Sequence, residues 1–275
     1  MISFGVLFVG HPEKLSYTCN RIEKTMRTHL RLLTLLLFLL LFLPLFAQQA
    51  DNGLWTSVEI KKKFNNGLSL SLDEEYKMRD NFSNTDKFET TIDLSWKPLS
   101  FLKGGIAYCR IDYNHPANNS NPAEYWELRH RYIAYLMGSY DIGRFSLSLK
   151  EKFQQTNRVG VDANVNKSNP TNVLRSKFEV DYNIKKSPFT PFASVEVYYA
   201  LNEPDGVQDP AATKMVTEIR NAIGVEYSIK KNLAIEAGYL YCIEKGWNKD
   251  AFGNNLGGYL SGYTNVLTIG LSYTF

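Results

Sequence analysis

The sequence contains little histidine or cysteine. The 275 residues include 4 His and 3 Cys, and none of them is grouped with the spacing of a metal site. No glycine-rich phosphate loop and no HExxH segment occurs. We therefore expect no metal, no cofactor and no catalytic residues, and the chain is not predicted to be an enzyme.

A surplus of charge of either sign is also missing once the first 47 residues are set aside. They hold five of the 31 basic and two of the 28 acidic residues, which accounts for the formal net charge of +3. The rest of the chain is neutral and offers no basic field to a nucleic acid. We expect no nucleic-acid partner.

Long apolar runs are confined to a leader. Residues 26–47 contain a short basic region, an apolar run, a break at Pro44 and the small residue Ala47. This layout predicts a secretory signal peptide cleaved after Ala47. A membrane anchor helix is the alternative, but the run is short for a bilayer that requires about 20 apolar residues. Residues 1–25 are expected to lie upstream of the true start at Met26.

The exported part, residues 48–275, alternates with period two. Leu70 and Leu72, for example, alternate with Ser71 and Asp73, which is typical of strands with one apolar and one polar face. Eleven such runs occur, at 54–64, 68–78, 87–96, 103–113, 125–137, 145–154, 174–184, 190–201, 214–228, 232–244 and 263–275.

The length of these runs separates a soluble sandwich from a membrane barrel. Soluble strands average about 5–6 residues, whereas strands that cross a membrane require about 9–11, and these runs reach that length. Short connections alternate with longer polar ones. The predicted fold is all-β: an antiparallel transmembrane β-barrel of 10–12 strands, with short periplasmic turns and longer extracellular loops.

The number of strands stays open at ten, eleven or twelve. Single-chain bacterial barrels have an even number, and eleven strands would require the N-terminus to reach the outer face through the lumen. Ten would result if the run at 54–64 is not a full strand. Twelve would result if a strand is hidden in 157–172. A small soluble lipocalin-like carrier is a further alternative, and it would turn its apolar face inward.

Two features favour the outer membrane of a Gram-negative-type bacterium. Aromatic residues fall at strand ends, where a girdle would lie. These are Trp96, Phe101, Tyr125, Trp126 and Tyr199. The chain also ends on alternating apolar residues, Leu271, Tyr273 and Phe275, which resemble a C-terminal assembly signal. Barrel-assembly machinery and outer-membrane lipid are the expected partners.

The alternation predicts an inner-face charge ladder of both signs. Its members are Glu127, Arg129, Arg131, Arg175, Lys177, Glu179, Asp181, Glu196, Glu218 and Arg220. A packed lumen that neutralises itself by pairing is favoured over a selective pore for small solutes. The solute of such a pore is not identified by the sequence.

A few polar residues interrupt the outward face. Glu74 and Glu151 fall past the middle of their strands, where a charge facing lipid costs only about 0–1 kcal/mol. A bulge that exchanges the two faces would explain them equally well. The same alternation places Cys109 on the outer face and Cys242 on the inner face. Two cysteines on opposite faces of the barrel wall cannot pair, so we expect two free thiols.

The exported part contains two histidines, and one of them raises an enzymatic alternative. His115 falls in a polar loop, where a solvated side chain is expected. His130 faces outward, where the base of a lipid-modifying outer-membrane hydrolase would lie. No serine stands two residues away on its strand, and no third group is evident.

Several segments resemble the family called domain of unknown function 2490. They are DNGLWTSVEI, YWELRHRYIAYL, VLRSKFEVDY and PFTPFASVEVYYALN. The resemblance extends over residues 50–275 and is most specific in the arginine-bearing strand, before Pro191 and at Glu196. It implies a secreted protein that forms an outer-membrane barrel, in a family whose function is uncharacterised, and it assigns no catalytic residue.

Overall fold

The computed structural model describes residues 51–117, 123–160, 169–202, 216–245 and 260–275. The expected signal peptide and the segment before it lie outside the described residues. Eleven strands make up the described part: β1 (Asp51–Lys63), β2 (Leu68–Arg79), β3 (Asn84–Leu99), β4 (Leu102–His115), β5 (Tyr125–Ile142), β6 (Phe145–Arg158), β7 (Thr171–Tyr182), β8 (Phe189–Ala200), β9 (Val216–Lys230), β10 (Leu233–Lys245) and β11 (Leu260–Thr274). Among these residues there is no helix of the length and hydropathy needed to cross a membrane.

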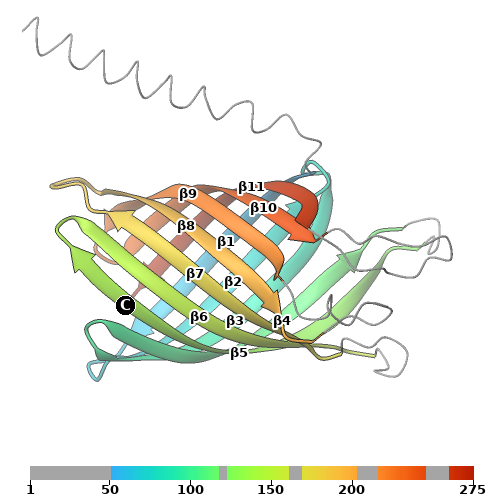
Figure 1. The fold of residues 1–275 in the computed structure, drawn as a ribbon, viewed down its shortest axis with the longest axis horizontal. Coiled ribbons are helices and arrows are strands. Elements are labelled where there is room, and N and C mark those ends of the chain that lie inside the picture. The colour runs from blue at the N-terminus through green and yellow to red at the C-terminus, as the bar shows by residue number, and fades with distance from the viewer. Residues whose placement is uncertain (1–50, 118–122, 161–168, 203–215, 246–259) are drawn as a thin grey trace, which may run out of the picture. The chain divides into compact units, whose positions relative to one another are not determined.

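The strands close into one barrel (Figure 1). Consecutive strands pair antiparallel all the way from β1 to β11. The closing pair, β1 with β11, is parallel, with Asp51 opposite Thr264 and Lys61 opposite Thr274. An odd number of alternating strands leaves the first and last pointing the same way, so a parallel seam is unavoidable. The predicted barrel is confirmed, and its antiparallel pairing holds everywhere except at this β1–β11 seam.

The strand number is eleven in the described residues, within the predicted range. The first run is a full strand of 13 residues, which excludes a ten-stranded barrel. No further strand is inserted between β6 and β7, because they pair directly from Phe145 opposite Tyr182 to Thr156 opposite Thr171. Strands of 12 to 18 residues are longer than the about 9–11 that a tilted crossing requires.

The apolar residues of the alternation face away from the lumen. Ile106 and Leu136 are both 62% exposed, while the inner-face Glu89 and Glu127 are 7% exposed. This arrangement is the reverse of that in a soluble carrier, so the lipocalin-like alternative is wrong. A continuous apolar outer surface with a polar interior is the pattern of a barrel that spans a membrane.

The predicted outward orientation of Cys109 is wrong. Cys109 faces inward, is 1% exposed and lines the lumen beside Ala107. Both faces of this part of β4 are largely apolar, with Ile106 and Tyr108 outside, so hydropathy does not distinguish them. Cys242 lies inward and is buried as expected, and both thiols are free.

Short turns gather at one end of the barrel, at the left of Figure 1, and we call it the short-turn end. The connection after β1 shows why its sequence suits a tight turn. Gly67 has φ +82°, which glycine adopts at little cost. A Cβ at this position would also lie 2.7 Å from the carbonyl oxygen of Lys97. The opposite end, where the longer connections lie, is called the long-loop end.

Both acidic residues predicted on the outer face lie there and are hydrogen-bonded. The Oγ1 of Thr90 donates to Glu74 at 2.9 Å, and the Oγ of Ser176 donates to Glu151 at 2.7 Å. The register around both residues is continuous, so the alternative of a bulge that exchanges the faces is wrong.

Candidate functional site

All ten members of the inner-face charge ladder lie on the lumen side of their strands, and they fall into separate clusters. The cluster at the long-loop end is centred on Glu127. Arg129 Nε donates to its carboxylate at 2.6 Å, and Arg158 donates twice at 2.7 Å. Arg129 and Arg158 lie directly opposite each other on β5 and β6, so the carboxylate between them offsets their repulsion.

His115 belongs to this Glu127 cluster, which corrects its predicted place in a solvated loop. It is the last residue of β4, and its Nε2 lies 2.9 Å from Glu127 Oε2. The ring of Tyr125 stacks on the imidazole with centroids 4.5 Å apart. Tyr125 therefore lies on the lumen side, unlike the outward-facing Trp96 of the expected girdle.

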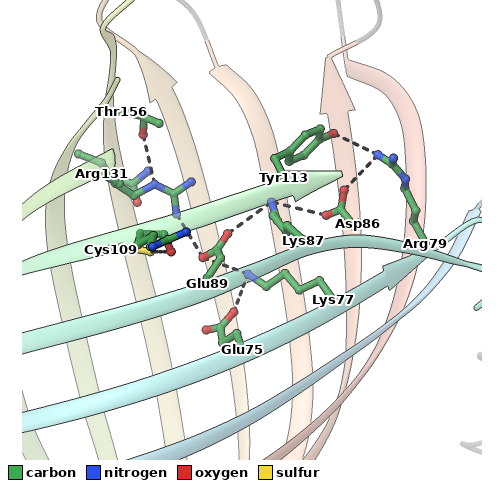
Figure 2. A network of polar contacts seen from close by, with 12 residues as sticks. Glu75, Lys77, Arg79, Asp86, Lys87, Glu89, Cys109, Tyr113, Arg131 and Thr156 are labelled. Atoms are coloured by element: carbon green, nitrogen blue, oxygen red, sulfur yellow. Dashed lines mark hydrogen bonds and ion pairs between the residues drawn. The ribbon is translucent and has the colours of Figure 1, made fainter. Parts of the chain in front are cut away.

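The second cluster is centred on Glu89 (Figure 2). Its carboxylate lies 3.4 Å from Lys77, 3.5 Å from Lys87 and 3.3 Å from Arg131. Lys77 also pairs with Glu75 at 2.5 Å. Two carboxylates and three cations are thus held together on β2, β3 and β5.

The third cluster joins Arg175 to Glu196 across β7 and β8. The guanidinium donates two bonds to the carboxylate, at 2.9 and 2.8 Å, and a third to Gln154 at 2.7 Å. The ring of Tyr198 lies between Arg175 and Arg220, at 4.3 and 4.5 Å from its centroid. Two cation–π contacts on one ring fix both guanidinium groups in the lumen.

Trp55 links the second and third clusters. Its ring lies 4.5 Å from Lys77 Nζ and 4.9 Å from the guanidinium carbon of Arg220. The indole packs on a small buried cluster that includes Leu240 and Val266. The indole thus contacts Lys77 on the neighbouring strand and Arg220 on β9 from the inner face of β1.

The remaining ladder members pair locally or lie in an acidic recess. Lys177 pairs with Glu179, and Arg220 pairs with Glu218, both at 2.5 Å. Asp181 lines a cavity of about 380 Å³ towards the short-turn end. Its acidic lining consists of Glu179, Asp181, Glu226 and Glu236.

Two further cavities lie along the lumen. The larger, about 400 Å³, is lined by the second cluster and by β4 to β7. Nine Lys and Arg residues line it against five Asp and Glu residues, so its charge is positive. The other cavity measures about 270 Å³. Trp55, Glu75 and Arg220 line both of these cavities and therefore mark the boundary between them.

The residues that connect the ladder were not among those predicted from the sequence. Lys77 and Glu89 show the same period-two signal as the named members and could have been included. Trp55 and Tyr198 gave no signal, because an aromatic side chain suits the lipid face as well as the lumen. In the structure both rings face inward and contact cations on neighbouring strands, Lys77 and Arg220 for Trp55 and Arg175 and Arg220 for Tyr198.

His130 lies on the outer face, as predicted. Its Nδ1 is 2.6 Å from the hydroxyl of Tyr108, and the two rings stack with centroids 5.9 Å apart. Its cross-strand neighbours are Arg110 and Asn157. In the described part of the chain, no three His, Cys, Asp or Glu side chains are grouped so that they could hold a metal ion.

A family model described as "Protein of unknown function (DUF2490)" matches residues 52–253. Among solved structures, the chain is similar to a NanC porin in a rhombohedral crystal form, with 13% identity, a TM-score of 0.46, and coverage of 82% of this chain and 98% of that one. OmpT of Vibrio cholerae, expressed in the outer membrane, gives 12% identity, a TM-score of 0.39, and coverage of 75% and 64%. Likenesses this distant say nothing about function. No curated protein matches the chain.

Proposed function

The chain belongs to the DUF2490 family, and from this premise we propose that it is an outer-membrane barrel that acts as a narrow passive pore for small solutes. The apolar outer surface supports the location, since closed barrels of this pattern satisfy every backbone group within a bilayer. The lumen supports the transport role.

The observation that carries the proposal is the space left inside the barrel. Cavities of about 400, 270 and 380 Å³ lie along the inner face. A lumen packed only for stability would leave few voids larger than a water molecule. Trp55 lines both the 400 Å³ and the 270 Å³ cavity, and cation–π contacts hold its side chain in place. The side chains at this point therefore form a narrow constriction for a small hydrated solute.

The enzymatic alternative receives no support from the surroundings of His130. A base for a hydrolase requires a nucleophile within hydrogen-bond reach and a third group that orients the imidazole. Tyr108 occupies Nδ1, and neither cross-strand neighbour of His130 is a serine or a carboxylate. We therefore favour a pore over a lipid-modifying enzyme.

Single-channel recording of the full chain in a planar bilayer tests the pore directly. Heat-shifted gel mobility first verifies that the barrel is folded. We expect discrete conductance steps, because water and ions would pass through connected cavities. A folded barrel that stays silent would overturn the pore and leave a structural role.

Export and assembly are part of the proposal. Leu271, Tyr273 and Phe275 lie exposed on the outer face of β11 and just beyond it, where assembly machinery could read them. We expect the protein to fractionate with the outer membrane, and Phe275→Ala to reduce the folded fraction there. A chain that stays in the periplasmic fraction would contradict the location.

A further inference from the structure

The basic excess of the 400 Å³ cavity is concentrated in three lysines on one side of the lumen. Lys103, Lys150 and Lys152 all line this cavity. No carboxylate among the described residues forms an ion pair with any of them, whereas the other six basic residues of the lining are paired. We call these three residues the lysine wall.

The acids near the lysine wall are already engaged. Asp93 accepts a hydrogen bond from the hydroxyl of Tyr135 at 3.0 Å. Glu196 accepts both of its bonds from Arg175. Neither carboxylate forms an ion pair with a residue of the lysine wall.

The strand register adds a second, independent observation. Lys150 lies directly opposite Lys177, and Lys152 lies directly opposite Arg175, on the inner faces of β6 and β7. Like charges directly opposite one another destabilise a sheet. Elsewhere in the lumen such pairs are bridged, as Glu127 bridges Arg129 and Arg158. In the lysine wall the bridging acid is missing.

Tyr135 gives the lysine wall a fixed aromatic surface. Its ring lies against Gly105, where a Cβ would come within 2.5 Å of the ring. Lys150 Nζ lies 4.1 Å and Lys103 Nζ 5.8 Å from the ring centroid. The hydrogen bond to Asp93 holds the ring in place, so two ammonium groups approach one fixed aromatic surface.

We propose that the lysine wall binds a small multivalent organic anion, whose carboxylate or phosphate groups supply the missing counter-charge. A cavity of about 400 Å³ falls within the usual range of small-molecule pockets, about 300–1,000 Å³. Charge-assisted hydrogen bonds from ammonium groups are the strong ones in such a site. The role of this anion as a transported solute rests on the proposed pore; its binding does not.

Isothermal titration of the full chain, folded in detergent, tests the site. The probes are citrate, inorganic phosphate and the neutral glycerol, all at constant ionic strength. We expect citrate or phosphate to bind and glycerol not to bind. The double variant Lys150→Gln/Lys152→Gln should weaken anion binding roughly tenfold or more, since each lost charged hydrogen bond removes about that factor.

The control is Lys97→Gln/Lys185→Gln, which removes the same charge from two exposed positions, one near the end of β3 and one in the turn after β7, and should leave binding unchanged. If the lysine-wall variant does not fold, Lys103→Gln at the start of β4 provides the same test. Absence of anion binding to the wild-type barrel, or equal binding by the lysine-wall variant and the wild type, would overturn the site.

Conductance measurements, together with the binding data, distinguish a failure of the anion site from a failure of the proposed pore. A barrel that binds citrate but does not conduct rejects the pore and retains the anion site. A barrel that conducts but binds neither citrate nor phosphate rejects the anion site alone. If phosphate binds and citrate does not, the ligand carries phosphate groups; the reverse result indicates carboxylates.

Discussion

Lys152 on β6 lies directly opposite Arg175 on β7, and only the second of these two cations has a carboxylate partner. Glu196 therefore offsets two positive charges while it pairs with one. The electrostatic balance of this part of the lumen depends on a single side chain.

Glu196→Gln should lower the free energy of unfolding by about 3 kcal/mol, the low end of the range for breaking a buried pair. The loss should be smaller in a Lys152→Gln background, because Arg175 then no longer faces a second cation. Urea unfolding of the four proteins in this double-mutant cycle measures the coupling. Equal losses in both backgrounds would show that Lys152 does not contribute.

Gly105→Ala should destabilise the barrel by about 1–3 kcal/mol, the usual cost of overpacking. The new methyl group would displace the Tyr135 ring and weaken its bond to Asp93. Gly138→Ala on β5 is the matched control, because nothing lies within 4 Å of its added Cβ. The cost at Gly105 should shrink when Tyr135 is Ala, and a cost independent of Tyr135 would disprove the contact.

The parallel seam predicts a specific disulfide. Val58 is opposite Leu271 and both face outward, so cysteines at these two positions should cross-link on mild oxidation, with Cys109 and Cys242 replaced by Ala. The pair Ile60→Cys/Ile269→Cys would cross-link in an antiparallel seam. In the parallel register these two are offset by four residues, about 13 Å along the strand, which is beyond disulfide reach. Gel mobility with and without reductant distinguishes the two cases.

Trp55→Ala should raise single-channel conductance, because the indole lines both of the cavities that it separates. Trp126→Ala, on the outer face, should leave conductance unchanged. Removing a packed indole costs about 3–5 kcal/mol, so heat-shifted mobility must verify the fold, and Trp55→Leu replaces the variant if needed. Conductance unaffected by either folded variant would exclude Trp55 as a constriction.

The alternation of the sequence was sufficient to predict the barrel, the strand positions and the side on which most charged residues lie. It failed at Cys109, where apolar residues occupy both faces of β4. The strand number stayed open because pairing between β1 and β11 has no local signal: its partners, such as Val58 and Leu271, are far apart in the chain.

The candidate site was harder to predict from the sequence than the fold. Period two places Arg175 and Lys152 on the inner face, but it does not fix the register that sets them opposite each other. Ion-pair partners such as Glu127 and Arg158 depend on that register and on side-chain reach. The lysine wall is therefore visible only when strand pairing is known.

The parallel β1–β11 seam also determines at which rim of the barrel the first strand begins and the last strand ends. In an even-stranded barrel the first strand begins and the last strand ends on the same rim. Here β1 begins at the long-loop end, while β11 ends at the short-turn end beside Lys61 and Lys63, which exchange backbone hydrogen bonds with Phe275. An epitope inserted at Asp51 and one appended after Phe275 would thus be displayed on opposite sides of the membrane, and no short linker could join them into a circular chain.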